Sequence, residues 1–310
     1  CLISKDADIT VAFRVELPEL FTVTSAEYEV MHSAWHKAIK VLPNFSIVHK
    51  QDWFISEEYQ GKLSEGELSF LARSSERHFN ERPYLKHSVY LFLTKSNRKR
   101  MAQQSNFSVL CRGRLVPKEI EDKEAVIKFM EAVDQFERII NDTLLLRLER
   151  MTEDELVGTE DRPGLLDRYF SLSEEGHASL EDIQLGADLV RVGDHRLCLH
   201  TLSDTEDLPT RVSIDGRYER LSTDRSDCRL SFASPVGLLL SCNHIYNQYL
   251  FIEDSDATLE RFEKQARNMH SLARYSRSNQ INEEWIQEYL NMAHSQGLTS
   301  IRAHFNVLAW

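Results

Sequence analysis

The sequence predicts an α+β fold with two mixed or antiparallel sheet domains and packed helices, the first domain ferredoxin-like, joined by a long helix. Strand-like and helix-like apolar periods alternate in the first third, a helical period fills the middle, and a period of two returns afterwards. At 310 residues and 42% hydrophobic composition, the chain can form two domains with buried cores. We place these at residues 1–117 and 176–310, with a helical connector at 118–175.

The first strand and helix have the clearest local signals. Apolar and polar residues alternate over 9–17, which predicts a half-buried strand. Thr24 and Glu27 have the spacing of a capping box, in which both side chains bond free amides at a helix start. Pro43 ends the helix that follows. Its apolar stripe consists of Met31, Ala34, Trp35, Ala38, Ile39 and Leu42.

The rest of the first domain continues the alternation. We expect a strand at 45–55, a helix at 67–80, an apolar strand at 89–93 and a further strand at 107–111. This order of strands and helices suggests a ferredoxin-like α+β layer.

The middle of the chain predicts one long helix over 118–151. Its apolar residues keep a three-four spacing for roughly four heptads, near the minimum for a coiled coil. We therefore favour a helix packed across its own sheet, and a coiled-coil seam stays the alternative. Thr152 and Glu155 form a second capping box, and Pro163-Gly164 interrupts the chain.

The last third returns to strands and ends on two helices and a strand. Strands at 183–192 and 196–202 flank Gly193-Asp194-His195, which predicts a hairpin. A strand within 229–252 precedes helices at 257–275 and from a cap at Asn282 to Gly297. The chain stops inside an alternating strand at 301–310 and begins without methionine, so we expect both ends to be cut from a longer protein.

Composition excludes several classes of protein. The net charge is −12, which disfavours direct nucleic-acid binding. No apolar run approaches the roughly 18 residues of a membrane span, and no secretory signal opens the chain. The five cysteines are scattered and form no C-x-x-C pair, so we expect reduced thiols in the cytoplasm.

The sequence contains no catalytic motif, and we predict no catalytic residue, cofactor or metal for this chain. Gly61 and Gly66 have the glycine spacing of a phosphate-binding loop, but Glu67 stands where the lysine belongs. A dinucleotide-binding G-x-G-x-x-G and a G-x-S-x-G nucleophile elbow are both absent.

Two residue pairs suggest a metal site or a catalytic pair, each with a simpler structural explanation. His32 and His36 have a spacing of four on the first helix, which suits a metal, although packing or solvation of both rings is the ordinary reading. Cys198 and His200 share one face of a strand and could begin a nucleophilic pair, whereas an apolar strand explains the cysteine as core. A pocket that gathers either pair with a carboxylate would indicate an unrecognised enzyme.

One stretch of the chain is strongly basic. Residues 82–118 contain nine Lys and Arg and no acid. The stretch could contact lipid headgroups, a nucleic-acid backbone or an acidic partner, or it could be a solvated edge hairpin that blocks edge-to-edge pairing. The candidate contact surface comprises Lys95, Arg98, Lys99, Arg100, Arg112 and Arg114.

Three longer blocks resemble a known family. They are residues 43–55 (PNFSIVHKQDWFI), 275–282 (YSRSNQIN) and 297–310 (GLTSIRAHFNVLAW). These blocks resemble the amino-terminal portion of the TraG-family conjugation ATPases of Bacteroides-type conjugative transposons. That family is similar to the VirB-class ATPases of type IV secretion, and the resemblance runs through essentially the whole chain.

The resemblance implies an assembly and docking region that positions its motor on the inner-membrane transfer complex, at the cytoplasmic face. Its P-loop ATPase module, with ATP and magnesium, would lie after Trp310, since no position here matches a Walker motif. Implied partners are other conjugation or type IV secretion components, the chain's own ATPase module, a second copy, and a peripheral membrane surface. A stand-alone interaction scaffold is the alternative.

Overall fold

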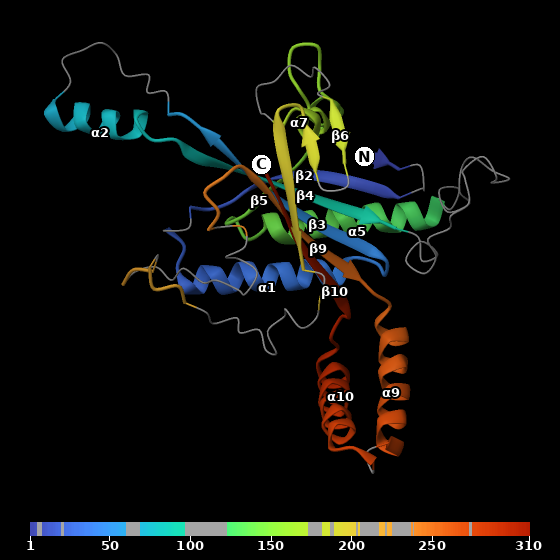
Figure 1. Ribbon diagram of the computed structural model, residues 1–310. Coiled ribbons are helices and arrows are strands. Elements are labelled where there is room, and N and C mark those ends of the chain that lie inside the picture. Colours follow the sequence, from blue (N-terminus) through green and yellow to red (C-terminus); the bar gives the residue numbers. More distant parts are fainter. Residues whose placement is uncertain are drawn as a thin grey trace.

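The fold is of the α+β class, as predicted, and the described strands form one antiparallel sheet (Figure 1). The computed structural model describes residues 1–4, 8–19, 22–59, 69–96, 123–172, 182–186, 189–202, 204, 217–220, 222–224, 237, 239–272 and 275–310. The sheet order is β1-β2-β4-β3-β9-β10-β8-β7-β6, with β5 also beside β2. The strands are β1 (Leu2–Ile3), β2 (Ile9–Glu16), β3 (Ser46–Glu57), β4 (Tyr84–Lys95), β5 (Arg147–Arg150), β6 (Ile183–Leu185), β7 (Val190–Val192), β8 (His195–Thr201), β9 (His244–Ile252) and β10 (Ile301–Ala309). The helices are α1 (Ser25–Val41), α2 (Phe70–Asn80), α5 (Lys123–Asn141), α6 (Glu153–Val157), α7 (Leu165–Ser171), α9 (Ser255–Leu272) and α10 (Arg277–Gln296).

The first half has ferredoxin-like topology. The elements β2-α1-β3-β4-α5-β5 give the strand order β5-β2-β4-β3 with antiparallel neighbours. This unit differs from the predicted one in its second helix, which is α5 instead of α2. The reason is burial: α5 buries five residues of its apolar stripe, whereas α2 buries none. The ferredoxin-like unit therefore runs past residue 117 to the end of β5.

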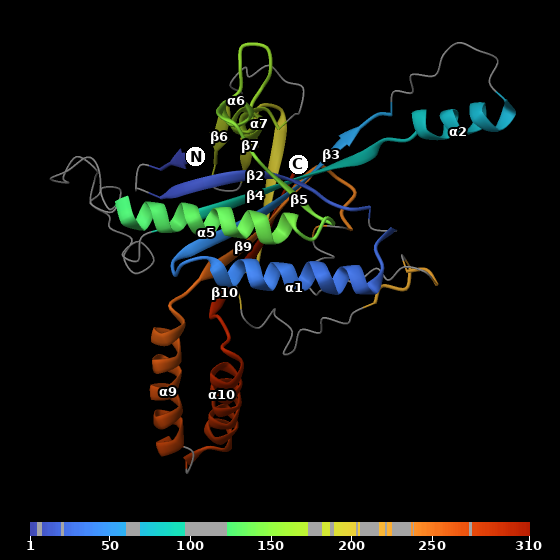
Figure 2. The same ribbon diagram turned by 180° about the vertical axis from the view of Figure 1, so that it is seen from behind.

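Helix α1 forms as its sequence predicts. Glu27 N donates to the Thr24 hydroxyl, and the Glu27 carboxylate accepts from Thr24 N, so the capping box is confirmed. Ala34 and Ala38 are buried against the sheet, and Trp35 meets Phe136 of α5 edge-on at 5.7 Å. Helices α1 and α5 thus lie side by side over one face of the sheet (Figure 2).

The long helix predicted over 118–151 is wrong at its carboxyl end. Helix α5 ends at Asn141, and the chain returns to the sheet as β5. The Asn141 side chain accepts from Leu148 N at 2.7 Å and donates to Leu148 O at 3.2 Å, which fixes the reversal. Leu144 adopts a positive φ of 58° in the turn and is exposed. Helix α5 packs across its own sheet, as the favoured interpretation expected.

The second half adds strands to the same sheet. Strand β9 pairs with β3 from Ile47–Phe251 to Phe54–His244, and β10 lies between β9 and β8. One sheet therefore contains strands from both predicted domains. The boundaries at 117 and 175 stay a prediction, because pairing alone does not say which parts fold independently.

Several predicted bounds in this half need correction. The hairpin at Gly193-Asp194 is confirmed, but 183–192 forms two short paired strands, β6 and β7, instead of one. Helix α10 begins after Ser276, whose φ of −155° is extended, well before Asn282. Strand β9 begins only at His244, and the strand expected at 107–111 lies outside the described residues.

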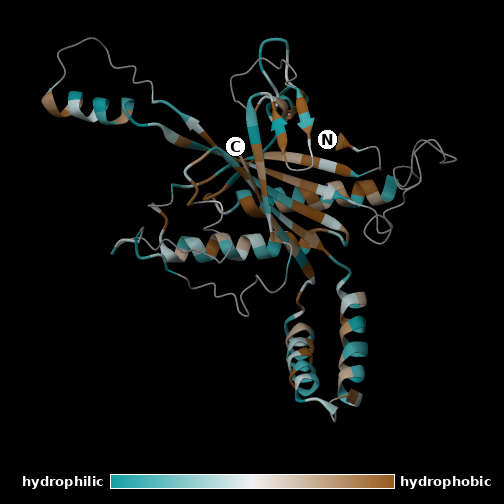
Figure 3. Cartoon of the chain, viewed as in Figure 1, coloured by the Kyte–Doolittle hydropathy of each residue, from teal (hydrophilic) through white to brown (hydrophobic). Residues whose placement is uncertain are grey.

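The opposite face of the sheet has its own smaller core. There α6 and α7 bury Leu156 and Leu165 against Trp53, Tyr90 and Ile245. Apolar residues are prominent along the central strands, and polar residues are frequent on the outer surfaces of the helices (Figure 3). The α9–α10 hairpin projects from β9 and β10, and α2 projects from the other end of the β3–β4 ribbon. Among the described helices, none has an apolar segment of the length that crossing a bilayer requires.

Candidate docking groove

A groove lies where the helical layer of the sheet stops. A helix is about 10 Å across and strands lie about 4.8 Å apart, so each helix covers about two strands. Helices α1 and α5 pack on the ferredoxin-like strands, and the sheet continues beyond these two helices into β9 and β10. The described residues place no further helix beside α1 on that side. The outer edge of α1 therefore borders an uncovered strip of sheet.

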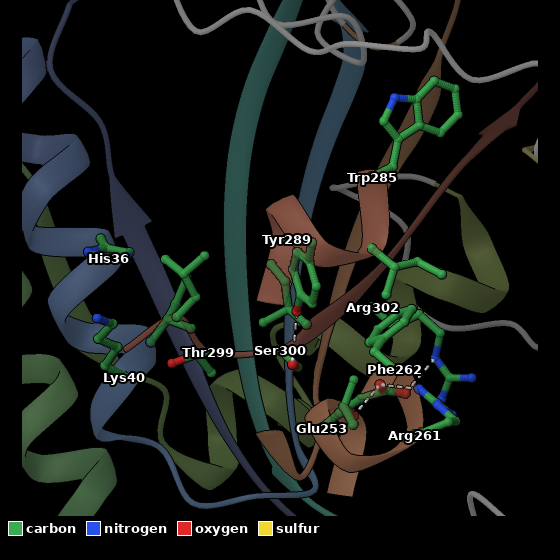
Figure 4. A pocket seen from close by; sticks show the side chains of 15 residues that line it. His36, Lys40, Glu253, Arg261, Phe262, Trp285, Tyr289, Thr299, Ser300 and Arg302 are labelled. Carbon is green, nitrogen blue, oxygen red and sulfur yellow. Dashed lines mark hydrogen bonds and ion pairs between the residues drawn. The ribbon is translucent and has the colours of Figure 1, made fainter. Parts of the chain in front are cut away.

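Two adjoining cavities form this strip, and we call them together the α1 groove. The larger, about 810 Å³, lies between α1 and the base of the α9–α10 hairpin, and the smaller, about 410 Å³, lies between α1 and strands β3 and β9. Both are lined by His36 and Ile39. Figure 4 shows the larger cavity, with α1 on one side and α9, α10 and the start of β10 on the other.

Much of the groove wall is aromatic or aliphatic. Phe262 of α9 packs edge-on against Tyr289 of α10 at 5.2 Å. Trp285, one helical turn before Tyr289, is 66% exposed, and Ile301 at the start of β10 is 47% exposed. Large apolar side chains that remain exposed in a groove are typical of contact surfaces.

The charged rim of the groove is already paired on the hairpin side. Glu253 Oε2 lies 3.7 Å from Arg261 Nη2, and Glu253 Oε1 lies 3.6 Å from Arg302 Nε. Figure 4 shows both arginines converging on this carboxylate. Ser300 N donates to Ser255 Oγ at 2.9 Å, which ties the start of β10 to α9. These contacts join the base of the hairpin to β10. Because the Glu253 carboxylate is paired with two arginines, it is poorly suited to act as a general base.

Across the groove, α1 presents a row of polar residues. His32, His36 and Lys40 follow one another at a spacing of four, so they lie on one edge of the helix. All three are exposed. Within the described part of the chain, no cluster of three His, Cys, Asp or Glu could hold a metal. The His32–His36 pair is therefore part of the groove edge, beside the apolar Trp35 and Ile39.

A buried ionic cluster supports the groove floor. Lys50 Nζ donates to Asp52 Oδ1 at 2.7 Å, and His87 Nε2 lies 2.9 Å from the same oxygen. Burial alone would raise the pKa of Asp52, but the His87 hydrogen bond and the Lys50 charge outweigh burial, so the pKa lies below its usual value. Burial, together with the Asp52 charge, raises the pKa of the neighbouring Tyr246 hydroxyl. Asp52 thereby fixes the direction of the Lys50 side chain at the cavity.

Sequence reasoning missed Asp52, although a signal existed. Lys50 and Asp52 stand two positions apart in a strand, so their side chains lie on the same face and bring opposite charges close together. The third member, His87, comes from β4, and its register against β3 is not readable from the sequence.

The residues singled out from the sequence have different outcomes. Lys95, at the end of β4, donates to Asn44 O at 2.9 Å, and burial lowers the pKa of its ammonium. The other members of the basic surface, Arg98, Lys99, Arg100, Arg112 and Arg114, lie outside the described residues. Cys198 and His200 share a face of β8 and are exposed, so the expectation of a core cysteine is wrong.

Comparison with known proteins adds one partial match. Residues 1–33 match a family model described as a domain of unknown function with a B. Theta gene description (DUF3875). The matched segment contains β1, β2 and the first half of α1, including His32 of the groove edge. It covers about a tenth of the chain and assigns no activity. No curated protein matches the chain.

Proposed function

We propose that this chain is a non-catalytic assembly and docking region of a conjugative-transfer ATPase of the TraG type, which positions the motor on the inner-membrane transfer complex. The α1 groove is the observation that carries the proposal. Its walls hold exposed aromatic and aliphatic side chains, and the Glu253 carboxylate is paired with two arginines. Such a site suits protein contact better than bond-making chemistry.

The sequence blocks behind the TraG resemblance support the same site. Block 43–55 contributes Val48 and Lys50 to the groove floor, and block 297–310 contributes residues 298–302 to its wall. Block 275–282 begins α10, the helix that carries Trp285. Two of the three blocks therefore contribute residues to the groove, and the third begins the helix that carries one of its wall residues.

The partners proposed for this region are other transfer components, its own ATPase module and further copies of the chain, at the cytoplasmic face of the inner membrane. The basic stretch from residue 82 to 118 would supply any lipid contact. ATP and magnesium would belong to a P-loop module after Trp310, because no residue here matches a Walker motif. The alternative is a stand-alone scaffold without such a module.

The test compares ATP turnover by this chain with turnover by a version extended several hundred residues past Trp310. We expect turnover in the longer protein alone, and a G-x-x-x-x-G-K-[ST] motif in the added sequence. Turnover by the present chain would contradict the proposal. A stop codon directly after Trp310 would favour the stand-alone scaffold.

A further inference from the structure

The α1 groove is rich in basic residues, although the chain as a whole is acidic. Four basic residues and a single acid line its two cavities, whereas the chain has a net charge of −12. The basic residues are Lys40, Lys50, Arg261 and Arg302, and the acid is Glu253. A concave surface lined by one sign of charge attracts partners of the opposite sign. The groove is therefore suited to an acidic occupant.

Ion pairs within the chain neutralise only part of this charge. Asp52 balances Lys50 at the smaller cavity. At the larger cavity Glu253 is shared by two arginines, so one positive charge remains uncompensated there. On the opposite wall Lys40 is exposed and makes no ion pair with any described residue. Figure 4 shows Lys40 on one side of the larger cavity and both arginines on the other.

Between these two charged walls the lining is largely apolar. Ile39 belongs to the α1 side of the larger cavity, and Tyr289 belongs to the hairpin side. Trp285 and Ile301 line the same cavity and are exposed. An occupant that covers these side chains needs an apolar stripe. Carboxylates on both sides of that stripe would meet Lys40 and the excess arginine charge.

The sheet beneath the groove favours a helical occupant. Strand β3 is paired with β4 and β9, and β9 is paired with β3 and β10. The floor of the smaller cavity therefore has no free strand edge to which an added strand could hydrogen-bond. A helix satisfies its own backbone groups and would fill the place beside α1 where the helical layer stops.

The groove is long enough for about two helical turns. Along α1, the row from His32 to Lys40 spans about 12 Å. Along β9, Gln248 lies four positions from Ile252, which pairs with Ile301, so the floor spans about 13 Å. Both lengths correspond to about eight residues of helix, which is enough for apolar anchors at i, i+4 and i+7.

We propose that the α1 groove binds an amphipathic helix of a partner protein, whose apolar stripe is flanked on both sides by Asp or Glu. The proposal rests on the proposed function only in taking the groove as a docking surface, and it adds the chemistry of the partner. Nucleic acid is the other common polyanion, and it binds along rows of cations that contact successive phosphates. The groove offers Lys40 and one excess arginine charge on opposite walls instead of such a row.

The experiment measures the binding of two synthetic peptides to the wild-type chain by fluorescence anisotropy. Both peptides have about 15 residues, are rich in alanine to favour a helix, and carry leucine at i, i+4 and i+7. The acidic peptide has glutamates on both sides of the leucines, and the basic peptide has lysines at the same positions. We expect the acidic peptide to bind at least about tenfold more tightly, with an affinity that falls as salt is added.

Two variants separate the charged part of the site from the apolar part. Lys40→Glu should weaken binding of the acidic peptide about tenfold and strengthen binding of the basic peptide, because one wall changes sign. Lys37→Glu is the matched control, since it makes the same charge change at an exposed α1 position outside the groove. Trp285→Ser should weaken the acidic peptide at least about tenfold, and Met292→Ser, exposed on α10 outside the groove, is its control. Circular dichroism verifies that each variant is folded.

Three results with the peptides would overturn the proposal: no binding of the acidic peptide at about 0.5 mM, equal binding of both peptides, or identical behaviour of Lys40→Glu and Lys37→Glu. Displacement of the peptide by single-stranded DNA would overturn it in favour of a nucleic-acid site. Self-association of the wild type that the peptide disrupts would place a second copy in the groove instead. These readouts do not involve ATP, so the proposal can fail while the ATPase assignment stands, and the reverse.

Discussion

At the residue scale, the buried carboxylate of Asp52 is a charge that depends on its partners. It is 3% exposed and is held by Lys50 and His87 on the sheet face that forms the groove floor. An unpaired charge at such a position is far more costly than a paired one. The cluster therefore couples the ionisation of one carboxyl to the packing of β3, β4 and β9.

We expect Asp52→Asn to lower the free energy of unfolding at pH 7 by about 3 kcal/mol, because Lys50 would lose its ionic partner. The pKa of Asp52 is lowered in the folded state, so its contribution is complete above the unfolded value of about 3.9 and is lost as pH falls through the folded value. The difference between variant and wild type should therefore shrink from pH 5 to pH 3 in urea titrations.

The matched control is Asp161→Asn, because Asp161 is exposed in a loop. It should change the free energy of unfolding by less than about 0.5 kcal/mol at every pH. A deficit in Asp52→Asn that stays constant from pH 5 to pH 3 would contradict the lowered pKa.

At the element scale, the Asn141 side chain ties the end of α5 to the start of β5. Asn141 bonds both the amide and the carbonyl of Leu148, and Leu148 pairs with Val15 of β2. We expect Asn141→Ala to cost about 1–2 kcal/mol in chemical unfolding, because two backbone groups lose their partner. Hydrogen exchange should accelerate in β5 and leave β3 unchanged. Asp142→Ala, at an exposed neighbour, should leave the exchange of β5 as it is.

The same turn shows what the sequence could predict about the elements. Signals that are local in sequence were read correctly, such as the Thr24–Glu27 capping box and the two-residue turn at Gly193-Asp194. The end of α5 was missed because Leu144 and Leu148 continue the helical apolar spacing. The apolar spacing gives no sign of the hydrogen bond between Asn141 and Leu148, seven positions later, that ends the helix.

The groove was harder to predict from the sequence than any single helix or strand. Its histidine row could be noted, since His32 and His36 stand four apart on a predicted helix. Its opposite wall comes from Phe262 and Trp285, more than two hundred residues later. These segments meet only because β9 pairs with β3, and antiparallel registers between distant strands cannot be read from apolar periodicity alone.

At the scale of the whole molecule, the pairing of β3 with β9 predicts one cooperative unit. Their register runs from Ile47–Phe251 to Phe54–His244, and Ile252 enters the core formed by α1 and α5. Separating residues 1–117 from 176–310 would expose that ladder and part of the core. A half-unfolded state would therefore lack the β3–β9 ladder and part of the core, so it should not be stable.

We accordingly expect urea unfolding to follow a single transition, with coincident midpoints in far-ultraviolet circular dichroism and tryptophan fluorescence. Native-state hydrogen exchange should give β4 and β10 the same largest opening free energy, because the shared sheet must open for either strand to be released. Two resolved transitions, with β10 opening at markedly lower cost than β4, would show instead that the domains expected at 1–117 and 176–310 unfold separately. The shared sheet would then be an interface between two folding units, and cutting the chain after β5, within 151–175, should leave the first unit folded.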